Sequence, residues 1–98
     1  MIQISEKQLI PKMKLLKDLV KGLYSRTTGI FSRGNFRVKG DIVDVFPGYS
    51  DVAYKIYFFG DEIEEIEVFN PIDNSNLGKV ENLRIFPANI FFTSDNQL

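Results

Sequence analysis

The side chains best able to do chemistry in this sequence are charged, and they fall into two groups. Basic residues gather at 26–39 and acidic residues at 61–67. Arg37 and Lys39 stand two residues apart in an alternating stretch, so they share one face of a predicted strand. Arg binds phosphate or carboxylate through a planar fork of donors, and Lys acts as a point charge. The basic group, which also holds Arg26 and Arg33, suits an anionic partner, and it is equally typical of an ordinary charged sheet surface.

The acidic run contains Asp61, Glu62, Glu64, Glu65 and Glu67. Paired carboxylates could transfer protons or bind a hard cation through oxygen ligands. The spacing matches no EF-hand loop, and strand alternation places Glu65 and Glu67 on an outward face. Charged side chains are mostly exposed in folded proteins. We therefore expect a turn followed by a solvated strand face, with no metal site.

Composition excludes most catalytic devices. The 98 residues include no Cys and no His, so there is no thiolate nucleophile, disulfide or imidazole base. Neither of the glycine-rich phosphate-binding motifs is present, and no serine stands in a nucleophile motif. We expect no enzyme activity and no cofactor in this chain by itself.

Charge is unevenly distributed along the chain. Residues 1–40 hold nine basic and two acidic residues, for +7, and residues 41–98 hold three basic and eleven acidic residues, for −8. Such an asymmetry can produce a basic face, or the two parts can interleave so that the charges mix. No apolar run is long enough to span a bilayer, and the N-terminus has no signal-peptide pattern. A cytoplasmic protein without membrane contact is expected.

The elements that must position these groups are one helix and several strands. Apolar residues recur at helical spacing over about 10–23, which predicts one buried stripe. The stripe comprises Leu9, Met13, Leu16, Leu19, Val20 and Leu23. Pro11 suits the first helical turn, and Gly22 is a plausible end. Strands are predicted at 1–5, 36–39, 42–46, 53–59, 65–69 and 83–86, with loops at 25–34 and 70–79.

Two Gly-Asp pairs, at 40–41 and 60–61, are typical of tight hairpin turns. A kinked continuous strand is the alternative at the first pair. Helix and strands are segregated along the chain, which favours α+β over a parallel α/β fold. We therefore predict a single α+β domain over 1–98. An antiparallel sheet of about four to five strands packs on one N-terminal amphipathic helix, and residues 93–98 form a frayed tail.

Three separated blocks of the sequence resemble the second domain of the UvrB family of bacterial nucleotide excision repair. The blocks are Tyr24-x-Arg26 with FSRGNFRVKGDIVDVFP at 31–47, FFGDEIE at 58–64 and IFPA at 85–88. Their order and approximate spacing match that domain over nearly the whole chain. The combination is more specific than a general strand pattern.

The resemblance implies a docking function. In that family the second domain binds UvrA, while other domains handle ATP and DNA and recruit the nuclease UvrC. The matching docking residues are Arg26, Arg37, Lys39, Lys55 and Tyr57. Tyr57 stands where the family pattern has a glutamate, and Lys39 and Lys55 stand for arginines, which keeps the charge and loses the planar fork. The same assignment predicts that Arg37→Glu weakens UvrA binding and leaves thermal unfolding nearly unchanged.

Two alternatives stay open at this point. The related UvrA-binding module of the transcription-repair coupling factor tends to show Gly-Gly where this chain has Gly40-Asp41. A nucleic-acid-binding domain could use the Arg37/Lys39 stripe, with Tyr54 or Tyr57 stacking on bases. The sequence pI of about 5.3 counts against the second alternative.

Overall fold

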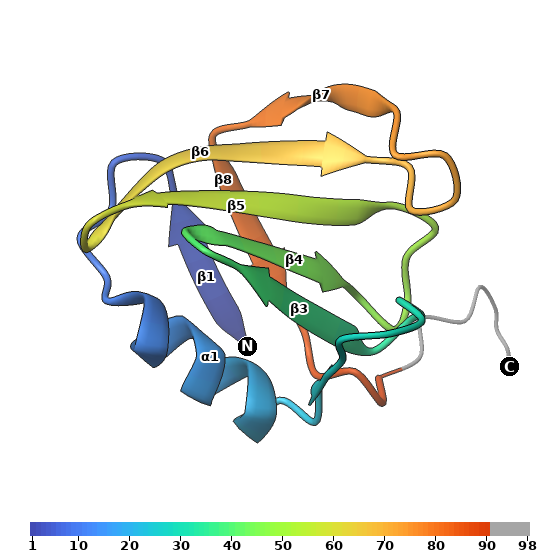
Figure 1. Ribbon diagram of the computed structural model, residues 1–98. Coiled ribbons are helices and arrows are strands. Elements are labelled where there is room, and N and C mark those ends of the chain that lie inside the picture. The colour runs from blue at the N-terminus through green and yellow to red at the C-terminus, as the bar shows by residue number, and fades with distance from the viewer. Residues whose placement is uncertain (91–98) are drawn as a thin grey trace, which may run out of the picture.

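A computed structural model describes residues 1–90 of the chain (Figure 1). In chain order the elements are β1 (Ile2–Ser5), α1 (Lys12–Lys21), β2 (Ser25–Arg26), β3 (Asn35–Lys39), β4 (Ile42–Phe46), β5 (Ala53–Phe59), β6 (Glu62–Phe69), β7 (Asn76–Val80) and β8 (Asn82–Ile85). The predicted tail at 93–98 lies outside the described residues. Within residues 1–90, no helix has the length and apolar character needed to cross a membrane.

Six strands form one sheet in the order β2-β3-β4-β5-β6-β7, and β1 pairs with β8 in a separate two-stranded ribbon. Every pair is antiparallel except β2 with β3, which is parallel. The ribbon and α1 lie against the same side of the large sheet (Figure 1). The predicted α+β class, with a mainly antiparallel sheet and one N-terminal helix, is confirmed, and the sheet is larger than the four to five strands expected.

The main core lies between the sheet and this covering layer. Inward side chains alternate with outward ones along each strand, as the pleat requires. Phe36 of β3, Val43 and Val45 of β4 and Ile56 of β5 are at most 2% exposed, and they pack with Leu15 of α1. The stretches predicted as alternating strands therefore fold because one of their faces is apolar.

Helix α1 buries a narrower stripe than predicted. Leu15, Leu16 and Leu19 are buried, whereas Met13 and Val20 are each 58% exposed. Leu9 and Leu23 are exposed too, and both lie outside the helix. Helical spacing shows which residues share a face, and the neighbouring elements decide how much of that face is covered. Pro11 caps the helix with extended backbone, so its predicted place in the first turn is also corrected.

The two predicted hairpins are present. Gly40 and Gly60 have φ of +58° and +60°, a backbone region that glycine enters without steric cost. The first turn joins β3 to β4 and the second joins β5 to β6, which rules out the kinked-strand alternative. Each turn sets the register of its hairpin.

Two strands lie where loops were predicted. β7 occupies the last four positions of the predicted loop at 70–79, and β2 lies at the start of the predicted loop at 25–34. β2 has only two residues, both exposed, and four of the five β7 residues are exposed. Neither strand buries an apolar face, so neither leaves a periodic pattern in the sequence.

The segment after β8 packs against two parts of the chain, the residues that follow α1 and the turn after β4. Tyr24 donates a hydrogen bond to the Phe86 carbonyl at 2.8 Å, and the Ala88 amide donates to the Gly22 carbonyl at 2.8 Å. A Cβ atom placed on Gly48 would overlap the Ala88 carbonyl oxygen. Only glycine therefore allows this approach of backbone to backbone.

Gly48→Ala should lower the free energy of unfolding by about 2–3 kcal/mol, because backbone on both sides must move to relieve the overlap. Gly29→Ala is the matched control, since its added Cβ would meet no atom within 4 Å. That variant should stay within about 0.5 kcal/mol of the wild type. Urea denaturation of the three proteins measures the difference, and equal stability of the two variants would show that the contact is dispensable.

Candidate functional site

The face of the six-stranded sheet opposite α1 carries a row of alternating charges, here called the charge row. Its members are paired in register across β3 to β7: Arg37 with Asp44, Asp44 with Lys55, Lys55 with Glu67, and Glu67 with Lys79. Side chains paired in this way stand on the same face within about 5.5 Å at Cβ. The row therefore alternates positive and negative across five strands.

Asp44 is the more buried of the two carboxylates in the charge row. Asp44 is only 2% exposed. Arg37 Nε donates to its Oδ2 at 2.7 Å, and Lys55 Nζ lies 3.2 Å from its Oδ1. A buried carboxylate is costly without such partners, because it loses its hydration. The two cations are thus held in fixed positions, with their side chains 21% and 23% exposed.

Glu67 is the second buried carboxylate, at 8% exposed. The Tyr57 hydroxyl donates to its Oε1 at 2.6 Å. This hydrogen bond, together with burial and the nearby negative charge, raises the pKa of Tyr57 to about 12. The prediction of a solvated strand face is right for the outward direction of Glu65 and Glu67 and wrong for the exposure of Glu67. Residues 1–90 hold no cluster of acidic side chains that could bind a metal ion.

An aromatic cluster runs alongside the charge row on β4, β5 and β6. Phe46 and Phe69 are buried there with Ala53, and Phe31 packs on them from the loop before β3. The rings of Phe31 and Phe69 stack with centroids 6.3 Å apart. The Arg37 guanidinium lies 4.2 Å from the centroid of Phe31, and Lys55 Nζ lies 4.4 Å from that of Phe69. Both cations are therefore held by a carboxylate and a ring face.

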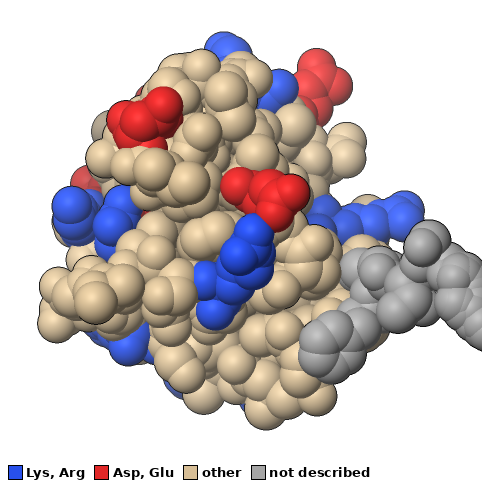
Figure 2. Space-filling view, turned by 90° about the vertical axis from the view of Figure 1, so that its right-hand side faces the viewer, with Lys and Arg blue, Asp and Glu red and all other residues tan. Residues whose placement is uncertain are grey.

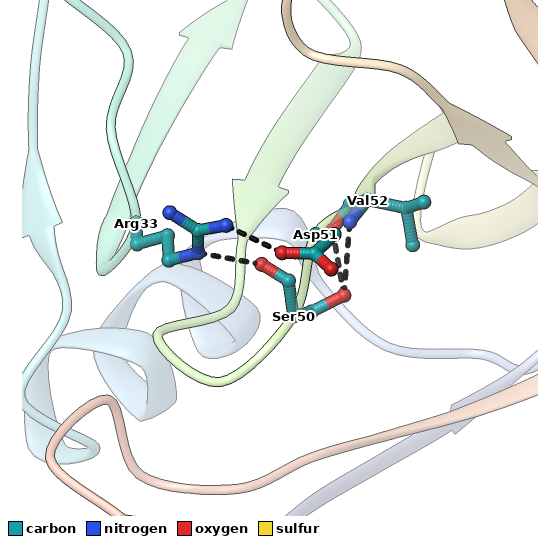
Figure 3. Close-up of polar contacts among 4 residues, drawn as sticks. All are labelled: Arg33, Ser50, Asp51 and Val52. Carbon is teal, nitrogen blue, oxygen red and sulfur yellow. Dashed lines mark hydrogen bonds and ion pairs between the residues drawn. The ribbon is translucent and has the colours of Figure 1, made fainter.

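Arg33 fastens the same loop to the turn after β4 (Figure 3). Its Nε donates to the Ser50 carbonyl at 2.9 Å, and its Nη2 lies 2.5 Å from Asp51 Oδ1. The Ser50 hydroxyl closes the turn by accepting from the Val52 amide at 3.1 Å. On this side of the molecule the charged side chains are scattered among uncharged residues and form no broad basic patch (Figure 2).

The structure brings together four of the five residues predicted to dock. Arg37, Lys39, Lys55 and Tyr57 all lie on the charge-row face, because they occupy alternating positions on β3 and β5. Lys39 is exposed and makes no ion pair within residues 1–90. Arg26 lies elsewhere: it pairs in register with Phe36, so it faces the α1 side of the sheet. The predicted set is therefore divided between two faces.

The prediction that Arg37→Glu leaves stability unchanged conflicts with this geometry. The substitution would place a second carboxylate beside buried Asp44 and remove its closest partner. Like charges at such a distance repel strongly in a buried setting. Arg37→Glu therefore confuses a docking defect with a folding defect.

Sequence reasoning missed Asp44, Glu67 and Phe31 as parts of the site. A signal for Asp44 was present, since a hairpin closed at Gly40-Asp41 pairs position 37 with position 44. The charge asymmetry also resolves here. Arg33 and Arg37 from the basic first part bind Asp51 and Asp44 from the acidic second part, so the two parts interleave.

Comparison with known proteins of related sequence shows the family of this chain. Residues 2–91 match the family described as the UvrB interaction domain. The chain belongs to this family. It is 46% identical over 91 residues to UvrABC system protein B of Cytophaga hutchinsonii, 44% over 95 residues to that of Lactobacillus johnsonii, and 42% over 93 residues to that of Bacteroides thetaiotaomicron. These alignments cover 93%, 96% and 95% of the chain and 14% of each relative, so the chain spans about one seventh of their length.

Asp44→Asn should destabilise this UvrB interaction domain by about 3 kcal/mol, at the low end for a broken buried ion pair because both cations keep some exposure. Asp51→Asn is the matched control, since its side chain is 92% exposed and its pair with Arg33 should contribute little. Urea denaturation measures both variants. Similar losses of unfolding free energy in Asp44→Asn and Asp51→Asn would show that the buried carboxylate contributes no more to stability than the exposed one.

Tyr57→Phe should lower stability by about 1–3 kcal/mol near neutral pH, because Glu67 loses its hydrogen-bond donor while staying buried. The folded-state pKa is raised above the unfolded value of about 10, so the contribution is complete below pH 10 and disappears as the pH rises to about 12. Tyr24, Tyr49 and Tyr54 also have raised pKa values, mainly from burial. The difference in unfolding free energy between wild type and Tyr57→Phe isolates Tyr57, and a pH-independent difference would refute this linkage.

Proposed function

We propose that this chain is the domain through which a UvrB-type protein docks onto UvrA during bacterial nucleotide excision repair. Membership of the UvrB interaction domain family supports the role, and the charge-row face supports the place. The observation that carries the proposal is a set of cations held in fixed positions on an outer sheet face. ATP hydrolysis, DNA handling and UvrC recruitment would belong to other parts of the longer protein.

The cations of this face keep binding capacity after their internal contacts are made. Arg37 uses Nε for Asp44 and a ring face for Phe31, and its terminal nitrogens make no hydrogen bond within residues 1–90. Lys39 on the same strand is exposed and unpaired in that part of the chain. A carboxylate-bearing surface of UvrA could therefore bind both. Arg37 is already held by its internal contacts, so it loses little freedom on binding, which lowers the entropic cost of association.

The pattern of the face favours a protein over a nucleic acid. Asp44, Glu65 and Glu67 stand among the cations, and each would repel a phosphate backbone. Alternating charge gives register and partner choice, whereas nucleic acid is bound by an extended positive field.

The Tyr57 position adds a feature of its own. The resemblance places a glutamate there in related proteins, and the tyrosine removes that charge. In this chain the Tyr57 hydroxyl contacts Glu67, so a carboxylate from β6 lies beside the same position. We propose that Glu67 and its neighbour Glu65 provide the negative part of the docking face.

Lys39→Glu should weaken binding to UvrA at least about tenfold, which corresponds to about 1.4 kcal/mol. Thermal unfolding should not change, because Lys39 is exposed and holds no internal ion pair in the described chain. Arg84→Glu makes the same change of charge on β8, outside the large sheet, and should bind UvrA like the wild type. Isothermal titration calorimetry at low salt gives the affinities.

Two results would contradict the proposal, the first its place on the charge-row face and the second its class of partner. If Lys39→Glu bound UvrA as tightly as the wild type, the charge-row face would not be part of the interface. A gel shift of DNA by the 98-residue chain, lost in Lys39→Glu, would favour the nucleic-acid alternative.

A further inference from the structure

A second surface lies on the α1 side of the sheet, away from the charge row. Between α1 and β2 runs a groove of about 450 Å³. Its floor is apolar and consists of Met13, Leu16, Val20 and Phe36. Met13 and Val20 are each 58% exposed. These two and Leu16 follow helical spacing, so they form a continuous stripe of about two turns.

The rim of the groove is basic. Lys17 and Lys21 border it on the helix, and Arg26 borders it on β2. All three are exposed, and none makes a hydrogen bond or ion pair within residues 1–90. None of the groove's lining residues is acidic. Asp18, the acidic residue of α1, does not line the groove and is bound by Lys14 at 2.8 Å.

We propose that this groove binds an acidic amphipathic segment of a protein partner. Apolar side chains at i, i+3 or i+4, and i+7 of such a segment would cover Met13, Leu16 and Val20, and acidic residues beside them would meet the three unpaired cations. Helix-in-groove recognition uses this arrangement of anchors. The proposal does not depend on UvrA docking, because it rests on residues of the opposite side of the sheet. Arg26 is the one groove residue that the sequence analysis also predicted to dock onto UvrA.

Other occupants fit less well. A nucleic acid could meet the cations and would leave the apolar floor uncovered. A second copy of the chain in a symmetric contact would bring two sets of Lys17, Lys21 and Arg26 together, and these like charges would repel. The groove therefore discriminates by two features at once, its floor and its rim.

The test uses the 98-residue chain and a designed peptide of about 18 residues, long enough to form a helix. The peptide carries Leu at i, i+3, i+4 and i+7, Glu beside these positions and Ala at the rest, because like charges four residues apart destabilise a helix. It bears a fluorescein label. A scrambled peptide of equal composition and a peptide with Lys in place of Glu are the controls. Fluorescence anisotropy should show binding of the first peptide alone, and amide shifts in the chain should map to α1 and β2.

Val20→Glu should reduce the peptide affinity at least about tenfold, because it places a carboxylate on the floor. Ile72→Glu is the matched control, since Ile72 is 92% exposed and does not line the groove. Lys39→Glu on the charge-row face should also leave peptide binding unchanged, so failure here is distinct from failure of the docking face. Lys17→Glu should weaken binding of the acidic peptide and strengthen binding of the lysine peptide.

Several results would overturn the proposal. These are no binding of the acidic peptide, equal binding by Val20→Glu, or equal binding of the scrambled peptide. DNA binding that is lost in Val20→Glu would point to a nucleic acid as occupant. Concentration-dependent self-association lost in the same variant would point to a second copy of the chain.

Discussion

Burial of the Asp44 carboxylate constrains the whole outer half of this domain. A carboxylate that is 2% exposed must be bound by donors, and here the donors come from the strands on either side. The strands β3, β4 and β5 must therefore keep one register. A slip of one residue would turn Asp44 into the apolar core and expose Val43 and Val45, so hydrophobic burial and ion pairing demand the same register.

The two faces of the sheet are consequently built on different principles. The inner face is apolar and is closed by α1 and the β1-β8 ribbon. Within residues 1–90 the outer face is covered by no helix or strand, and it is stabilised by the charge row and by the Phe31 loop. Charged residues can remain half-buried there because each has a fixed partner. The same arrangement leaves donors available at the surface, so under the proposed function Arg37 would serve both stability and recognition.

Local signals in the sequence predicted the parts of this fold that local chemistry decides. The Gly-Asp pairs identify the hairpins at Gly40 and Gly60 because only glycine readily accepts the backbone needed there, and alternation predicts the strands with one buried face. β7 could not be predicted, because its pairing with β6 buries almost no side chain. The face of Arg26 was also hidden, since it depends on a parallel pair between two segments separated by an irregular loop.

The candidate site likewise has parts that local sequence predicts and parts that only the fold reveals. Strand alternation places Arg37 and Lys39 on one face, whereas the burial of Glu67 depends on Tyr57 reaching it from the neighbouring strand.

The alternating row also bears on how such a face can change during evolution. Each of the cations Arg37 and Lys55 is tied to Asp44, so a substitution at one position alters the partner of the next. Tyr57 illustrates this: it carries no charge, yet its hydroxyl fixes Glu67 and so keeps a carboxylate at that place. If it docks as proposed, a face built in this way can exchange individual residues while its sequence of charges across the strands is preserved. Its specificity then resides in the pattern, which a partner must match in register, more than in any single residue.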